Sequence, residues 1–305
     1  MADFQRINAI LREESRTPIP HPSLAFASQS KFYRQVAEIA SNARDEAIIR
    51  EAIAIFSSLM ESEEEEFPVD GDFAESVMSF LRGIASNGSM MVGVETEGAI
   101  VGLLFGIATK IRLQPETLPM WFTTRCLSDE GPGLGITNGT TESGNVGRGG
   151  AIGTVIDKHE DFPLFYLLID YVHHEGRVGD FARTGLLYLI ESASHSAELE
   201  TWLVQSDLAT LMASGLGALY SQLSRKLVLS YTDHDLPVIL ALSDYSGPSL
   251  HLDAETSTSL DFLAHLTTFL SYLLFWQDVL EHCKSLEVKQ TLLDHFQVIF
   301  LEQLL

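Results

Sequence analysis

The sequence is poor in cysteine and contains no long uninterrupted apolar run. Its 305 residues include two cysteines, Cys126 and Cys283, which lie far apart and in no metal-ligand spacing. This usage is typical of a reducing compartment and excludes a disulfide-stapled secreted domain. The longest apolar stretch, residues 262–276, is broken by polar residues and is shorter than the roughly 20 residues that a membrane span needs. The N-terminus also lacks the apolar core of a secretory signal. We therefore predict a soluble cytoplasmic protein without a transmembrane segment.

Basic residues are scarce as well. Lysine and arginine number 19 against 42 aspartates and glutamates, which gives a formal net charge of −23. The resulting negative field would repel phosphate backbones and anionic lipid headgroups. The charge balance therefore argues against a nucleic-acid-binding function.

What the sequence does have is helical periodicity over most of its length. Ile48, Ala52, Ile55 and Leu59 are spaced as on one face of a helix, and Asp45 before them is a typical N-cap residue. Residues 91–111 are glycine-containing and could form a buried helix or short strands, of which we favour the helix. Further helices are predicted at residues 73–84, 161–174, 180–190, 196–203, 206–219, 237–246, 256–283 and 285–300.

Most of these segments are apolar over a wide face, and hydrophobic residues make up 46% of the chain. This pattern predicts an all-α fold, an armadillo- or HEAT-like α-solenoid of stacked helix pairs. No repeat of fixed period is visible, so the repeats are expected to be degenerate. The sequence ends at Leu304 and Leu305 inside an apolar helix, which predicts a solenoid truncated at its C-terminus.

The composition divides the chain into four segments. Residues 1–30 are weakly patterned and contain a proline-spaced linker at 17–22, so we expect a weakly ordered N-terminal segment. Residues 31–127 are expected to form helical repeats. Nine glycines among residues 128–153 predict a flexible loop. Residues 154–305 are expected to continue the same solenoid.

No motif predicts catalysis or a cofactor. His173, His174 and Glu175, with residues 159–161 upstream, are zinc-ligand residue types, but they lack the H-E-x-x-H spacing. Adjacent histidines on a helix point about 100° apart and chelate one ion poorly. The glycine-rich segment at 131–135 is neither a dinucleotide nor a P-loop fingerprint, and no serine lies in a nucleophile elbow. The sequence therefore predicts a non-enzymatic protein without metal or cofactor.

A polar stretch at residues 170–183 interrupts the apolar helices. We expect a helix that is capped by Asp161 and runs to His174, a turn made by Gly176 and Gly179, and a second helix opened by Asp180. In one interpretation Arg177 and Arg183 pair with nearby acids in an ordinary corner between helices. In the other, the corner recognises a partner at the edge of a scaffold. The candidate interaction residues are His173, His174, Glu175, Arg177, Asp180 and Arg183.

Several of these stretches together resemble a known family. Residues 162–171, the corner after them, residues 185–188 and the run Leu208 to Lys226 are similar to the core of the FTS–Hook-interacting proteins (FHIP), also called retinoic-acid-induced-16-like proteins. The last of these runs is the most specific, with Ser224 where many members have proline. The similarity covers residues 160–305, and more weakly 30–125.

The resemblance implies an α-solenoid that joins an FTS-type protein to a Hook coiled-coil adaptor. Such a complex would connect dynein–dynactin to early endosomes, with a Rab GTPase as the membrane cue. Members of the family are longer, so the chain resembles an N-terminal part. Two alternatives remain open at this point: a general helical-repeat module with other partners, and an all-helical enzyme with an unrecognised site near His173, His174 and Glu175.

Overall fold

The computed structural model describes residues 2–62, 67–86, 93–125, 159–226 and 259–304. Within these ranges the chain is helical apart from one small antiparallel sheet of two strands, so the predicted all-α class is confirmed. The predicted glycine-rich loop at 128–153 and the predicted helix at 237–246 lie outside the described residues. No helix in the described ranges is long and apolar enough to cross a lipid bilayer.

The α-helices, in chain order, are α1 (Ala2–Glu14), α2 (Pro22–Ser30), α3 (Tyr33–Ser41), α4 (Glu46–Met60), α5 (Gly71–Ser86), α6 (Val94–Leu113), α7 (Pro163–Ile169), α8 (Gly176–Ser192), α9 (Ala197–Gln205), α10 (Leu208–Lys226), α12 (Leu260–His282), α13 (Leu286–His295) and α14 (Glu302–Leu304). The 3-10 turns are η1 (Phe67–Val69), η2 (Pro115–Trp121) and η3 (Ala193–His195), while the π-helical segment η4 (Phe296–Leu301) joins α13 to α14. The strands are β1 (Thr123–Arg125) and β2 (His159–Asp161), with Thr124 paired to Glu160.

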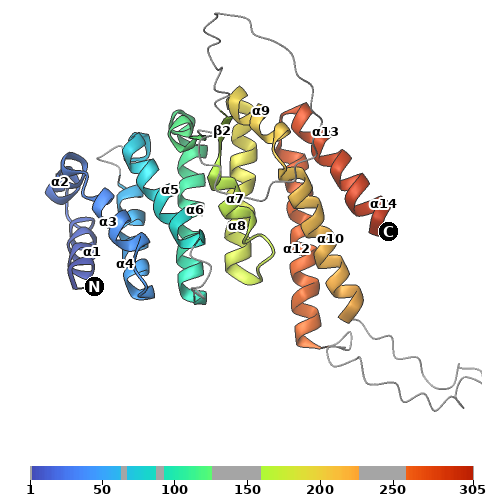
Figure 1. Ribbon diagram of the computed structural model, residues 1–305, viewed down its shortest axis with the longest axis horizontal. Helices are drawn as coiled ribbons and strands as arrows, with labels where there is room; N and C mark the ends of the chain where they lie inside the picture. The colour runs from blue at the N-terminus through green and yellow to red at the C-terminus, as the bar shows by residue number, and fades with distance from the viewer. Residues whose placement is uncertain (1, 63–66, 87–92, 126–158, 227–258, 305) are drawn as a thin grey trace, which may run out of the picture.

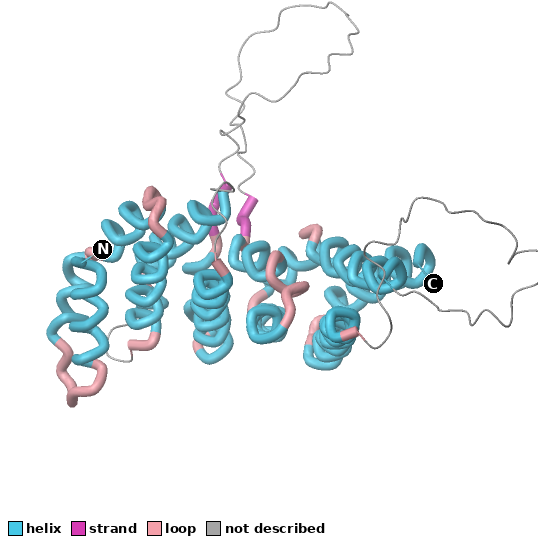
Figure 2. Tube along the Cα trace, turned by 90° about the horizontal axis from the view of Figure 1, so that it is seen from below, coloured by secondary structure: helices cyan, strands magenta, loops and turns pink. Residues whose placement is uncertain are grey.

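The helices lie side by side in a row that begins with α1 and ends with α14 (Figure 1). Along the row α1 packs on α4, α4 on α6, α6 on α8, α8 on α12, and α12 on α10. Seen from below, the same helices form an extended array rather than a ball (Figure 2). One buried apolar cluster runs through the whole row, from Phe4 in α1 to Phe300 in η4. Each helix therefore shares its core mainly with its neighbours, as in a stack, and the armadillo or HEAT type stays a prediction.

Local sequence signals explain where many helices begin. Asp45 is the N-cap of α4, and its side chain accepts a hydrogen bond from the Ala47 amide at 3.0 Å. Ser196, Ser259 and Ser285 cap α9, α12 and α13 in the same manner. These side chains satisfy amide groups that have no partner within the helix. The predicted cap at Asp45 is thus confirmed, and the predicted helices at 196–203 and 285–300 begin at serine caps.

The glycine-containing segment at 91–111 is helical over its described part, as predicted, because α6 spans Val94–Leu113. A Cβ at Gly102 or Gly106 would meet no other atom within 4 Å. Neither glycine is therefore needed for close packing.

The N-terminal residues differ from expectation. In place of a weakly ordered segment at 1–30, residues 2–14 form α1 and residues 22–30 form α2. Phe4 and Leu11 are buried against the rest of the row, and the Asn8 side chain donates to the Glu51 carbonyl oxygen of α4 at 2.8 Å. The order of α1 thus comes from tertiary contacts with α4, which local patterning does not reveal.

The helix boundaries around residue 170 were also predicted wrongly. Asp161 is not a helix cap but the end of β2, and Phe162 occupies the N-cap position of α7. The helix α7 ends at Ile169, before the two histidines. Gly176 does not end a helix but begins α8, so Asp180 lies one turn inside α8. Strands of three residues carry no periodic signal, which is why β2 could not be predicted.

Candidate protein-interaction site

The corner at residues 170–183 connects α7 to α8 and depends on two glycines. Gly176 has φ +65°, a left-handed conformation that glycine adopts without a steric penalty. Gly179 lies in the first turn of α8, where a Cβ would stand 1.9 Å from the carbonyl oxygen of His174. Any larger residue at 179 would force the turn away from α8. Gly176 and Gly179 thus lie in the first turn of α8 and not in the turn before it, and the chain uses one for its φ and the other for its lack of a side chain.

The buried side chain of Arg183 links the turn to α8 by hydrogen bonds. Its side chain is 7% exposed and lies between the turn and α8. Nη1 donates to the Val172 carbonyl oxygen at 2.6 Å, and Nη2 donates to Asp180 Oδ1 at 2.6 Å. The buried guanidinium therefore has both a carboxylate and a backbone acceptor, the arrangement that makes a buried charge tolerable. The predicted pairing of Arg183 with a nearby acid is confirmed.

His173 points from the corner towards α10 and α12. Its ring centroid lies 5.0 Å from that of Tyr272, and the Tyr272 hydroxyl donates to the Met212 carbonyl oxygen at 3.1 Å. Nε2 of His173 is buried without a hydrogen-bond partner in the structure. Burial lowers the pKa of His173, and the charges of His174 and Arg183 add to this. His173 is thus held as a neutral packing group.

His173 fits because the facing residue of α10 is a glycine. A Cβ on Gly215 would lie 2.0 Å from Nε2 of His173, closer than any real contact. Gly215 belongs to the run at 208–226, and His173 belongs to the corner. Two of the stretches on which the family resemblance rests therefore touch each other.

The next two residues of the corner make contacts with other helices. His174 Nδ1 lies 3.9 Å from Glu97 Oε2 on α6. Glu175 Oε1 lies 3.1 Å from His265 Nδ1 on α12. The side chains of His173, His174 and Glu175 therefore contact three different neighbours and do not converge on one point. Among the described residues no group of three or more His, Cys, Asp and Glu side chains is placed to hold a metal ion.

The exposed part of the corner is small. Glu175, Arg177 and Asp180 are exposed, and the guanidinium carbon of Arg177 lies 4.8 Å from the ring centre of Phe181. This is a cation–π contact one helical turn away, and not the pairing with an acid that one of the two interpretations of the corner gave to Arg177. Of the six candidate residues, these three are the ones that a partner could reach most easily.

Comparison of the sequence with known proteins shows which family the chain belongs to. A sequence profile of the family described as "Retinoic acid induced 16-like protein" matches residues 23–305. The chain belongs to this family. Relatives found among curated proteins carry the name FHIP family protein, so the resemblance to the FTS–Hook-interacting proteins is confirmed.

Three of these relatives are insect proteins. An FHIP family protein of Drosophila melanogaster is 38% identical over 74 residues, which cover 24% of this chain and 7% of the relative. The same figures apply to one from Drosophila erecta. An FHIP family protein of Anopheles gambiae is 24% identical over 188 residues, covering 61% of this chain and 16% of the relative. The matched segments thus span a small part of these relatives' length.

In this retinoic-acid-induced-16-like chain, the matched region begins inside α2 and includes the corner with α6, α8, α10 and α12. The helix α1 lies before the matched region. Sequence reasoning overlooked a second surface there, an apolar groove between α1, α2 and α3. Large apolar residues such as Phe26 and Ile39 are visible in the sequence, but the sequence does not show that they stay exposed after folding.

Proposed function

We propose that this chain is a non-enzymatic scaffold in a complex of the FTS–Hook–FHIP type, which links dynein–dynactin to early endosomes or other vesicle cargo. The observation that carries the proposal is the family match over residues 23–305. The partners would be a Hook-type coiled-coil adaptor and an FTS-type protein, with a Rab GTPase marking the membrane. In this role the protein would be cytoplasmic and peripheral to the vesicle.

The shape of the molecule supports a scaffold. An extended row of helices offers more surface per residue than a ball of the same length, and stacked-helix proteins use such surfaces to bind partners. Leu263, Leu270 and Leu274 are exposed on α12, at 43%, 47% and 60%, and their spacing puts them on one stripe of the helix. Exposed apolar stripes are typical of protein-binding surfaces. The net charge of −23 favours protein partners over phosphate-rich ones.

The exposed rim of the corner would contribute polar contacts. Glu175, Arg177 and Asp180 offer both signs of charge within six residues at the start of α8. Rim charges of this kind tune association rate and partner choice more than affinity. Arg183 would act only by holding Asp180 and the turn in place.

The test is affinity purification of the tagged natural protein from its own cells, followed by mass spectrometry. Recovery of Hook, FTS and dynein subunits is the expected result. Recovery of a reproducible but unrelated set of proteins would leave a general helical-repeat binding module and withdraw the transport role. A charge reversal, Arg177→Glu, is expected to reduce recovery of one partner. Arg50→Glu, which makes the same change at an exposed ion pair between α4 and α6, is the matched control.

A further inference from the structure

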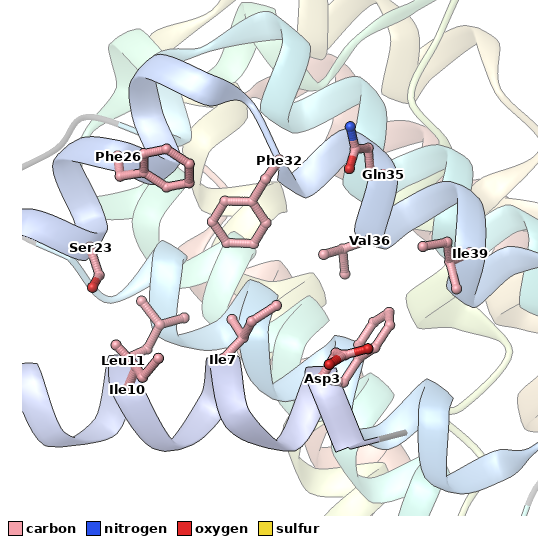
Figure 3. A pocket seen from close by; sticks show the side chains of 11 residues that line it. Asp3, Ile7, Ile10, Leu11, Ser23, Phe26, Phe32, Gln35, Val36 and Ile39 are labelled. Atoms are coloured by element: carbon pink, nitrogen blue, oxygen red, sulfur yellow. The ribbon is translucent and has the colours of Figure 1, made fainter.

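The N-terminal end of the row carries an apolar groove of about 420 Å³ between α1 on one side and α2 and α3 on the other. In Figure 3, Ile7, Ile10 and Leu11 rise from α1 toward Phe26, Phe32 and Val36 on the opposite wall. Three rim residues are exposed although they are large and apolar: Phe26 at 64%, Ile39 at 54% and Ile10 at 41%. Grouped apolar exposure of this kind marks an interaction surface, whereas single exposed residues do not.

Polar contacts hold the α1 wall of the groove in place. Asn8 on the buried face of α1 donates to Glu51 of α4, which fixes α1 against the row. At the other end of α1, the Glu14 carboxylate accepts from the Ser23 amide at 3.0 Å and from its hydroxyl at 2.6 Å. The wall therefore exists before anything binds, and a preformed site loses less entropy when it is occupied.

The α3 wall is anchored to the residues around the start of α5. Lys31 and Arg34 form ion pairs with Asp72, which lower the pKa of that carboxyl. The Tyr33 hydroxyl donates to Asp70. Burial, with Asp70 beside it, raises the pKa of Tyr33 well above its usual value, so the phenol stays protonated. The cations closest in sequence to this wall are thus already paired with acids.

The charge around the groove limits what it can bind. Of the described residues that line it, Asp3 is the one charged side chain, and Ser23 and Gln35 are the polar ones. Arg6 and Arg12 also lie on α1 but not among the lining residues. Asp3 in the groove, together with the net charge of −23 over the whole chain, favours a basic partner over a second copy of the chain or anionic lipid.

We propose that this groove binds an amphipathic helix of a partner protein, with apolar anchors one turn apart and lysine or arginine on the flanks. The anchors would cover Phe26, Ile39 and Ile10, as in other helix-in-groove complexes, and a basic residue would approach Asp3. Because the groove includes α1, which precedes the family-matched region, the inference does not rest on the proposed transport function.

The direct test is fluorescence anisotropy of a labelled peptide titrated with the whole chain. The probe is a peptide of about 18 residues, long enough to form a helix, with leucine on one face and lysine on the other. A second peptide has glutamate in place of lysine. A third has the same composition as the first, but its leucines are scattered around the helix.

We expect saturable binding of the leucine–lysine peptide to the unaltered chain. The double variant Phe26→Gln/Ile39→Gln should bind the peptide with a dissociation constant roughly tenfold higher, because the anchor contacts are lost. The matched control, Leu286→Gln/Leu293→Gln, changes two exposed leucines of α13 at 78% and 44% and should bind within about twofold of the unaltered chain. Equal weakening by both variants would overturn the proposal. So would binding of the glutamate or scattered peptide with the same affinity as the first, or flotation of the chain with phosphatidylserine vesicles that depends on Phe26 and Ile39.

Discussion

Two surfaces of this molecule differ in how their side chains are used. The corner at 170–183 is rich in charge, yet Arg183 is buried, His173 packs on Tyr272, and Glu175 reaches His265. The groove at the N-terminal end is poor in charge, yet Phe26 and Ile39 remain exposed. The corner satisfies most of its groups within the chain, whereas the groove leaves apolar groups uncovered. What distinguishes the groove, as a docking surface, from the corner, as a junction between helices, is therefore the exposure of its side chains after folding and not their polarity.

The largest effect is expected at the corner, from Gly179→Ala. The new Cβ would lie 1.9 Å from the His174 carbonyl oxygen and 2.8 Å from Arg183 Nη1, so the backbone of the turn must move. We expect a loss of about 3 kcal/mol or more in the free energy of unfolding, measured by urea titration. Gly102→Ala in α6, where the space is empty, should instead gain up to about 1 kcal/mol. If the two variants had equal stability, the close approach at Gly179 would be disproved.

Arg183→Leu should have the next largest effect. It removes the donors to the Val172 carbonyl and to Asp180, and leaves the buried carbonyl without a partner. We expect a loss of about 2–3 kcal/mol in the same titration. Arg177→Leu, at an exposed site on the same helix, should change stability by less than about 0.5 kcal/mol. Similar values for the two arginines would mean that the corner is not held by Arg183.

Arg177 and Arg183 show which structural features the sequence predicts and which it does not. Both are charged residues in a polar stretch, and nothing in their local sequence separates the buried one from the exposed one. Caps and apolar periodicity, by contrast, are local, which is why Asp45 and the helical segments at 48–59 and 91–111 were predictable. The order of α1 depends on Asn8 meeting Glu51, 43 residues away. Long-range contacts of this kind also determine which faces stay exposed, so the groove could not be predicted.

The third prediction concerns pH and His173. Its folded-state pKa is below its unfolded value of about 6.5, so the unfolded chain binds the proton more readily. The contribution of His173 is therefore fully present above pH 6.5 and is lost as the pH falls below it. Between pH 7.5 and 5.5 the unaltered chain should therefore lose stability relative to His173→Gln, measured as the free energy of unfolding at each pH. Parallel pH profiles of the two proteins would show that His173 is not desolvated.

The smallest effect is expected in the groove. Phe26→Gln/Ile39→Gln should change the free energy of unfolding by less than about 0.5 kcal/mol, because both side chains are more than half exposed. Thermal unfolding checks this, and it also shows that any loss of peptide binding is not a loss of fold. A large destabilisation would mean that Phe26 and Ile39 stabilise the fold. The groove would then not differ from the corner in leaving side chains uncovered.

The contrast between the two surfaces is tested most directly by hydrogen–deuterium exchange of the whole chain with and without the leucine–lysine peptide. We expect slower exchange in the presence of the peptide to be confined to α1, α2 and α3, and exchange at residues 170–183 to stay unchanged. Protection of residues 170–183 with no change in the first three helices would contradict the account, because the corner would then be the docking surface and the groove would not.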